Sequence, residues 1–139
     1  MLHLVLYFRM LLTPHKNMKA PAQRVLKTSW FSKAAKKAGI DDSELCDAAK
    51  ELMHGLGDDL GGGVWKKRLD KNKHRSIVLN KVGKRWIFTF LFAKKDRDNI
   101  SDKELVAFKK LSKNYAEASA QNIAELVKDG ELLEICHDC

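Results

Sequence analysis

Apolar positions in the first half of the chain follow two helical stripes, preceded by a short run with strand character. Residues 25–30 predict a strand, and residues 32–38 predict a short helix that ends at Gly39, a residue type common just past a helix C-terminus. Asp41 predicts the N-cap of a second helix. The apolar positions of this second helix recur at helical spacing: Leu45, Ala48, Ala49, Leu52, Met53 and Leu56.

The middle of the chain changes to strand-like alternation. Residues 64–69, 75–80 and 84–93 predict three strands, and Gly83 supplies the backbone freedom that a turn between the last two requires. The third strand is apolar on both faces, so we expect it to be central and covered by helices. Strict alternation places these aromatic residues on one face, opposite Ile87 and Leu91: Trp86, Phe88, Phe90 and Phe92. Core packing is the main interpretation of this aromatic face, and stacking of nucleic-acid bases is the alternative.

The C-terminal third is predicted to be helical again. Ser101 and Glu104 form the pattern of a capping box, which starts one helix. A second helix is expected over residues 115–128, ending at Gly130, and residues 131–135 predict a last edge strand. The fold class predicted is α+β: an N-terminal helical pair packed on a small antiparallel sheet, with C-terminal helices.

The length of 139 residues fits one domain. Residues 1–12 are apolar but too short to span a bilayer, and they lack the basic start and small-residue cleavage site of a signal peptide. Met18 opens a segment that resembles an ordinary protein start. We therefore expect residues 1–17 to be a non-native extension and residues 18–139 to form a single domain.

Three cysteines are present, and no secretory signal accompanies them. This indicates a reduced, cytoplasmic protein with no membrane partner. Cys136 and Cys139 form a C-x-x-C pair that could hold a metal or form a disulfide. A second ligand pair at zinc-finger spacing is missing, so we expect no metal site.

The positive charge is concentrated in one block of the sequence. The formal net charge of the chain is +8, yet residues 64–98 hold twelve Lys or Arg against three Asp or Glu, a net charge of +9. A concentrated block of this kind indicates a local site for a polyanion, most often nucleic acid.

Common catalytic arrangements are missing around this block. The sequence shows no carboxylate pair for metal-assisted hydrolysis and no nucleophile triad, and the glycines of residues 57–63 lack the lysine and helix of a phosphate-binding loop. No cofactor is expected. If the protein is an enzyme, its chemistry must rest mainly on Lys and Arg, with His74, the only His in the block, as a candidate general base.

Alternation sorts the cations of the block. Lys66 and Arg68 share a face of their strand, and a surface that also collects Arg75 and Lys94 would destabilise the empty protein by repulsion. A phosphate chain would neutralise such a cluster. The remaining basic residues are candidates for RNA binding: Lys67, Lys71, Lys73, Lys95 and Arg97.

Three motifs of the block resemble the RelE superfamily of type II toxins, and its RelE-like or HigB-like branch in particular. They are W-K-K-R-L, H-R-S-I-V-L and R-W-I-F-T-F-L-F-A-K-K-D-R-D-N-I-S-D-K-E-L, within a resemblance that covers residues 25–135. The resemblance implies a small α+β ribonuclease that binds the ribosome, cuts messenger RNA there and is neutralised by a cognate antitoxin. It also implies an antitoxin of the helix-turn-helix type, and binding of operator DNA only by the toxin–antitoxin complex.

The resemblance assigns roles to individual residues. The paired basic strand positions of the family fall on Lys66 and Arg68, its strand-starting arginine on Arg75, and its basic residues after the long strand on Lys94 and Lys95. Two tyrosines used by family members are replaced here. His74 stands in a shortened turn where one is common, and the position of the other lies around Ser101.

Two alternatives to a ribosome-associated RNA endonuclease stay open at the level of sequence. One is a gyrase poison of the ParE-like sister branch, which has fewer active-site cations. The other is a non-enzymatic module, such as a decayed toxin, that binds RNA or a partner.

Overall fold

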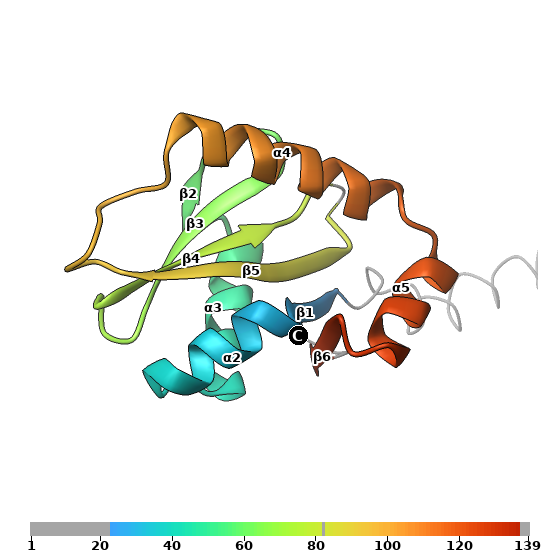
Figure 1. Ribbon diagram of the computed structural model, residues 1–139, viewed down its shortest axis with the longest axis horizontal. Coiled ribbons are helices and arrows are strands. Elements are labelled where there is room, and N and C mark those ends of the chain that lie inside the picture. Colours follow the sequence, from blue (N-terminus) through green and yellow to red (C-terminus); the bar gives the residue numbers. More distant parts are fainter. Residues whose placement is uncertain (1–22, 82, 137–139) are drawn as a thin grey trace, which may run out of the picture.

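The computed structural model describes the backbone of residues 23–81 and 83–136. Its elements run along the chain as follows: β1 (Arg24–Thr28), α2 (Ser29–Ala38), α3 (Asp42–Met53), β2 (Asp58–Asp59), β3 (Val64–Leu69), β4 (His74–Leu79), β5 (Arg85–Ala93), α4 (Asp102–Glu117), α5 (Ala120–Lys128) and β6 (Leu132–Cys136). Figure 1 shows the sheet between two helical layers, with α4 over one face and α2 and α3 against the other. The predicted α+β class is confirmed.

The sheet has six strands in the order β2-β3-β4-β5-β1-β6. The predicted meander of β3, β4 and β5 is antiparallel, and β6 is antiparallel to β1. The strand β1 instead runs parallel to β5, so the sheet is mixed. Side-chain alternation carries no information about strand direction, which is why the pattern along the chain could not predict this pairing.

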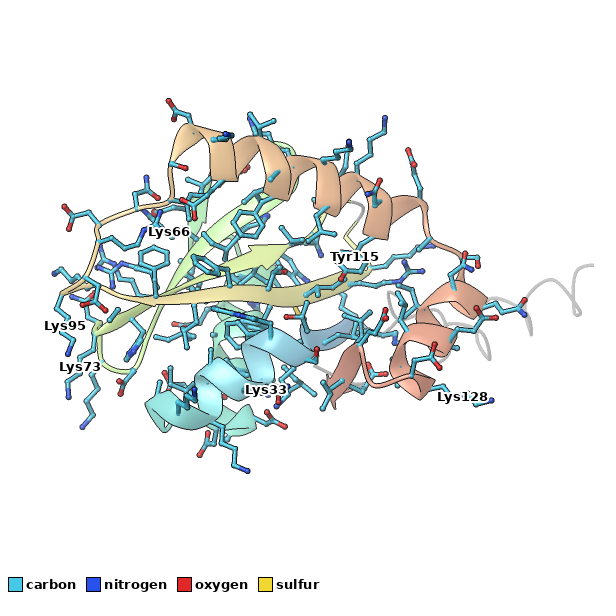
Figure 2. All side chains as sticks on the ribbon, viewed as in Figure 1. Lys33, Lys66, Lys73, Lys95, Tyr115 and Lys128 are labelled. Atoms are coloured by element: carbon cyan, nitrogen blue, oxygen red, sulfur yellow. The ribbon has the colours of Figure 1, made fainter. Side chains whose placement is uncertain are left out.

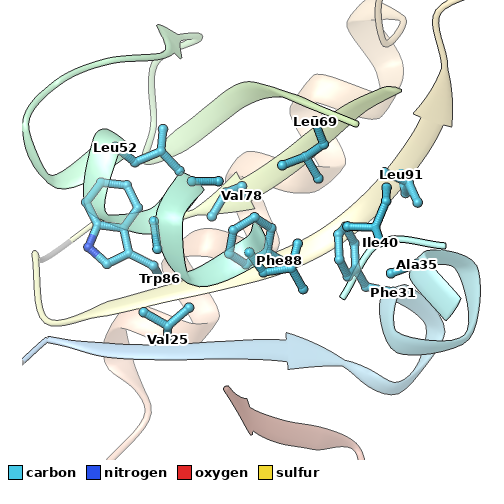
Figure 3. Close-up of a cluster of buried hydrophobic side chains, with 13 residues drawn as sticks. Val25, Phe31, Ala35, Ile40, Leu52, Leu69, Val78, Trp86, Phe88 and Leu91 are labelled. Carbon is cyan, nitrogen blue, oxygen red and sulfur yellow. The ribbon is translucent and has the colours of Figure 1, made fainter. Parts of the chain in front are cut away.

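Each face of the sheet has its own hydrophobic core. The cluster against α2 and α3 is drawn in Figure 3, and its largest members are Phe31, Leu45, Leu52, Trp86 and Phe88. The cluster on the opposite face, beneath α4 and α5, includes Ile77, Ile87, Phe92, Ile123 and Leu132. Burial on both faces explains why β4 and β5 lack a polar side, as expected for central strands.

A β-bulge in β5 divides its aromatic residues between these two cores. Val78 pairs with Phe88 whereas Ile77 pairs with Phe90, so Thr89 is an extra residue on β5. Trp86 and Phe88 therefore face α2 and α3, and Phe90 and Phe92 face α4. The prediction that all four aromatic residues share one face is wrong, because the bulge reverses the alternation at Thr89.

Two helix starts differ from the sequence-based expectation for reasons of capping. The Thr28 side chain accepts a hydrogen bond from the Phe31 N–H, so α2 begins at Ser29 and Trp30 lies in the helix instead of in a strand. The last helix begins after Ser119, whose capping box with Asn122 fixes the start. The expected start at Tyr115 is wrong, since that residue still belongs to α4.

Some expectations concern parts of the chain outside the description. The proposed extension over residues 1–17 lies outside the described residues, as do the side chains of the C-x-x-C pair. Cys46 on α3 is disulfide-bonded, so the expectation of a fully reduced protein is wrong at this residue. Within residues 23–81 and 83–136, no helix is long and apolar enough to cross a membrane.

Candidate functional site

Three of the predicted catalytic residues lie on one face of the sheet. Arg68 stands directly opposite Arg75 in the β3–β4 pairing, and Lys66 stands opposite Ile77 one step along. Arg75 is in turn opposite Phe92 of β5. Residues that face each other across an antiparallel pair project to the same side. Lys66, Arg68 and Arg75 therefore lie on the same face of the sheet as α4.

Arg75 is the most buried cation of this group, with 8% of its surface exposed. Its Nη1 donates to the carbonyl oxygens of Asn72, at 3.1 Å, and of His74, at 3.2 Å. In the described part of the chain, no carboxylate lies within 4.0 Å of Arg75 or of the exposed Arg68. A buried guanidinium without a counter-charge is costly, so this arrangement favours an anionic ligand.

Arg97 joins the same face from the loop that follows β5. Its guanidinium carbon lies 5.4 Å from the centroid of the Phe92 ring, in a cation–π arrangement. Two of its nitrogens donate to the carboxylate of Glu104, in the first turn of α4, and Nε donates to the Asn99 carbonyl at 3.0 Å. We call the set of Lys66, Arg68, Arg75 and Arg97 the cationic face.

Glu104 holds Arg97 and caps α4 with the same carboxylate. Its Oε1 accepts from the Ser101 backbone N–H at 2.7 Å, which completes the predicted capping box. The hydrogen bond from Arg97, followed by the bond from the Ser101 backbone, lowers the pKa of Glu104 to about 2. The same bond raises the pKa of Arg97. The helix start and the arginine are therefore fixed relative to each other.

Lys66 carries a partial counter-charge, since its Nζ lies 3.8 Å from Oδ2 of the exposed Asp58 on β2. The distance is long for an ion pair, and 65% of the Asp58 side chain is exposed to solvent. A surface pair of this kind contributes little, about 0–1 kcal/mol. A ligand phosphate can therefore displace Asp58 from Lys66 at low cost.

The turn between β3 and β4 has an unusual backbone. Asp70, Lys71 and Asn72 all have positive φ values, of 53°, 49° and 73°. Left-handed conformations cost about 1–2 kcal/mol at residues other than glycine, with Asn and Asp the best tolerated. Neighbouring groups hold the turn in place: Glu44 of α3 accepts from the Asp70 backbone N–H, and Arg75 binds the Asn72 carbonyl. The shortened turn is thus built around Arg75.

The same turn orients His74. Its Nδ1 lies 3.1 Å from Oδ2 of Asp70. His74 is opposite Leu69 and Ala93 in the sheet, on the face away from Arg75. An imidazole held at Nδ1 by a carboxylate presents its Nε2 outward, in the arrangement of an oriented general base.

A pocket of about 550 Å³ lies beside His74 at the end of the sheet. We call it the tip pocket. Its walls come from the β3–β4 turn and from the segment after β5, which meet where Lys94 N–H donates to the Lys73 carbonyl. The lining residues are Asn72, Lys73, His74, Ala93, Lys94, Lys95 and Asp98. Figure 2 shows Lys73 and Lys95 gathered at this end of the molecule.

The predicted RNA-binding residues divide into two groups. Lys71, Lys73 and Lys95 are exposed at the tip, and Arg97 lies on the cationic face. Lys67 points to the other face of β3, where its Nζ donates to the Leu56 carbonyl at 2.8 Å and lies 3.3 Å from Glu51 of α3. The structure therefore gives Lys67 a role in docking α3, apart from the other predicted cations.

Several functional partners escaped the sequence reasoning. Asp70 and Glu44 act through the turn geometry, and Glu104 acts through a contact with a loop arginine. No spacing pattern in the sequence predicts these contacts. Tyr115, the tyrosine on α4, lies far from Lys73 and Lys95 in Figure 2, and burial raises its pKa. His74, which lines the tip pocket, is therefore the better placed candidate for proton transfer.

The described residues contain no group of three or more His, Cys, Asp or Glu side chains that could hold a metal ion. The tip and the cationic face offer fixed positive charges, an imidazole oriented by Asp70 and a pocket. Such groups can bind a phosphodiester and stabilise added negative charge on it.

Comparison with known proteins gives one match. Residues 23–135 match the model of the family described as "RelE toxin of RelE / RelB toxin-antitoxin system". No curated protein and no solved structure matches the chain. The family match spans nearly all of the described residues, including the cationic face and the tip pocket, and implies a cognate antitoxin as partner. The chain therefore belongs to the RelE family of type II toxin–antitoxin toxins.

Proposed function

We propose that this toxin is an endoribonuclease that cuts messenger RNA on the ribosome and so inhibits translation. Toxins of the RelE family are typically endoribonucleases. The single observation that carries the proposal is Arg75: a buried guanidinium, paired in register with Arg68, that no described carboxylate neutralises. An anionic ligand would supply the counter-charge that the described carboxylates do not, and the phosphodiester of RNA is the ligand that the family implies.

The proposed reaction is attack by a ribose 2′-hydroxyl on the adjacent phosphorus. The bond from the 2′-oxygen to phosphorus forms as the bond to the 5′-oxygen breaks, which leaves a 2′,3′-cyclic phosphate and a 5′-hydroxyl. Arg68, Arg75 and Arg97 stabilise the extra negative charge on the phosphorane. The RNA supplies the nucleophile and the arginines stabilise the charge. The step still needs one group that accepts the proton of the 2′-hydroxyl and one that donates a proton to the 5′-oxygen.

His74 and Lys94 are assigned to these proton transfers. Both line the tip pocket at the end of the sheet, whereas Arg75 points to the other face of β4, so the proposal places the scissile linkage at the end of the sheet, between the two sets of groups. His74 Nε2 takes the proton of the 2′-hydroxyl, while Asp70 holds the imidazole at Nδ1. Lys94 lines the tip pocket with His74 and gives a proton to the departing 5′-oxygen. The backbone bond between Lys94 and Lys73 keeps the two walls of the pocket together.

Substitution of Arg75 tests the proposal. We expect Arg75→Ala to abolish growth arrest on induction without antitoxin, and to lower cleavage of ribosome-bound message by about 10²–10³-fold, the usual effect of removing one transition-state donor. Arg75→Lys keeps the charge but loses the forked donor geometry of the guanidinium. Its cleavage rate is expected to lie between those of the wild type and Arg75→Ala. Primer extension on translated messages provides the measurement.

Lys113→Ala is the matched control, because Lys113 is an exposed cation in the last turns of α4 and lies 4.0 Å from the carboxylate of Glu117. It should arrest growth like the parent. Circular dichroism confirms that each variant is folded, since Arg75 also holds the β3–β4 turn. An Arg75→Ala protein that is folded and fully toxic contradicts the proposal. Arrest with intact messages and inhibited supercoiling would instead indicate the gyrase poison.

The cognate antitoxin is proposed to be a helix-turn-helix protein, and its complex with this toxin to bind operator DNA. The support is the resemblance of the block over residues 64–105 to the HigB-like branch. A DNA-binding assay with the toxin alone and with the product of the neighbouring reading frame tests it. Retardation of operator DNA by the toxin alone contradicts the proposal.

A further inference from the structure

Trp30, near the start of α2, is half exposed although it is the largest type of apolar side chain. Its exposed fraction is 51%. One face of the indole stacks on Phe90 of β5, with ring centroids 5.1 Å apart and an interplanar angle of 25°. Among the described residues, Phe90 is the aromatic ring that contacts the indole, so the face away from Phe90 can accept a second flat group. Trp65, in contrast, is partly buried and packs against the buried Trp86, at the core beneath α3.

A continuous series of ring contacts leads from Trp30 to the cationic face. Phe90 lies 6.0 Å from Phe92, measured between centroids, and Phe92 carries Arg97 at 5.4 Å. Phe92 is also directly opposite Arg75 in the sheet. Each step is thus 5–6 Å long. The open indole face therefore sits a few side chains away from the arginines that bind phosphate in the proposed function.

The helix that carries Trp30 adds positive charge beside it. The sequence of α2 contains three lysines and no acid. Lys33 and Lys37 follow Trp30 by three and seven residues, so they lie along the same side of the helix. Both are exposed, and no carboxylate of the described chain lies within 4.0 Å of either. Figure 2 shows Lys33 on α2, on the opposite side of the sheet from α4.

We propose that Trp30, with Lys33 beside it, is a second RNA-binding site on which one base of the single-stranded message stacks, outside the cleavage site. Aromatic rings next to cations are the general means of holding single-stranded nucleic acid, because every base has a flat face and every linkage a phosphate. The site would hold the message at a distance from the scissile phosphate. The inference rests on the proposed function for the identity of the ligand.

RNA fits this surface better than a protein partner does. The open area is a single indole flanked by lysines, whereas a protein-binding patch normally combines several exposed apolar groups. Two further large apolar residues of the described chain are exposed: Leu56 lies in the loop after α3, and Val106 lies on α4. They are therefore not part of the α2 surface.

Quenching of tryptophan fluorescence by RNA tests the proposal. The probe is a single-stranded RNA oligonucleotide with 2′-deoxy substitutions, which binds but cannot be cut because it lacks the attacking hydroxyl. We expect the wild-type protein to be quenched on titration, and Trp30→Leu to lose the quenching and bind about 5- to 150-fold more weakly, the range for one lost stacking contact. Trp30→Phe should retain part of the affinity.

Trp65→Phe is the matched control, since Trp65 is partly buried against the core beneath α3 and its loss should leave both the quenching and the affinity unchanged. Lys33→Ala should weaken binding and flatten its salt dependence. If wild-type protein is not quenched, or if folded Trp30→Leu binds as tightly as the parent, the inference is overturned. The inference is also overturned if Trp30→Leu keeps its affinity for RNA and loses only its affinity for the antitoxin.

These outcomes are separate from those for the proposed function. RNA binding that depends on Trp30, in a protein that cuts no message, supports the binding site and contradicts the ribonuclease. Cleavage that depends on Arg75 but not on Trp30 supports the ribonuclease and removes the binding site.

Discussion

At the scale of the residue, the orientation of His74 comes from the turn that precedes it. Its Nδ1 lies 3.1 Å from Oδ2 of Asp70, the first residue of that turn. The turn therefore supplies both the imidazole and the carboxylate that orients it. This contact depends on three consecutive residues with positive φ, which bring the Asp70 side chain back toward the strand.

Substitution of His74 tests its role as general base. We expect His74→Gln to lower cleavage by about 10²-fold or more, and to remove the acidic limb of the pH–rate profile, because Gln cannot take up a proton. Asp70→Asn should give a smaller loss, since it leaves the imidazole in place. The measurement is the rate of message cleavage on purified ribosomes between pH 5 and 9. An unchanged profile in His74→Gln would assign proton transfer to another group.

Glu104 gives a pH prediction with a definite sign. Its pKa of about 2 in the folded protein lies below the ordinary value of 4.5. The ionised carboxylate therefore stabilises the folded state fully above pH 4.5, and this stabilisation is lost as the pH falls through about 2. Glu104→Gln should lower the thermal unfolding midpoint at pH 7 and leave it unchanged at pH 2.

The control for this prediction is Glu117→Gln on the same helix. Glu117 is exposed and its distance to Lys113 is 4.0 Å, so its loss should have little effect at either pH. A difference between Glu104→Gln and wild type that persists undiminished at pH 2 would show that packing, and not charge, is responsible.

At the scale of the element, the position of α4 depends on the glycine loop before β3. Gly63 has a φ of 77°, and a Cβ there would lie 2.6 Å from Oγ of Ser112 and 2.8 Å from Cα of Lys81. The Ser112 hydroxyl donates to the Gly63 carbonyl at 3.1 Å. The glycine thus permits α4 to lie directly on the loop. Since α4 also carries Glu104, the loop contributes to the placement of Arg97.

Gly63→Ala should therefore destabilise the protein by about 2–4 kcal/mol, from left-handed backbone strain and overpacking together. Gly39→Ala is the matched control, because Gly39 has a φ of 73° with no atom near its missing Cβ. It should cost only about 1 kcal/mol. Urea unfolding measures both, and equal losses would show that contact with α4 adds nothing.

The elements also show what alternation can and cannot predict. The face shared by Lys66, Arg68 and Arg75 follows from strict pairing in one tight hairpin, so it was predictable. Alternation also separated Lys67 from Lys66. Arg97 comes from a loop, and the contact between Asp70 and His74 depends on a left-handed turn. Neither leaves a periodic signal in the sequence.

At the scale of the whole molecule, several exposed cations lie at one end of the sheet, and the two cores lie on its opposite faces. Lys71, Lys73, Lys94 and Lys95 are exposed at the end formed by the turns after β3 and β5. Lys81 and Lys84 of the same basic block are exposed in the turn between β4 and β5, at the other end. Because these lysines are in contact with water, solvent and salt screen their mutual repulsion in the absence of a polyanion.

The extra residue at Thr89 lets one strand present aromatic rings to both helical layers. Trp86 and Phe88 pack in the core against α2 and α3, whereas Phe90 and Phe92 lie on the opposite side, where Trp30 stacks on Phe90 and Arg97 lies over Phe92. A strand of regular alternation would keep all four rings on one side. A single inserted residue thus places the two rings that Trp30 and Arg97 contact.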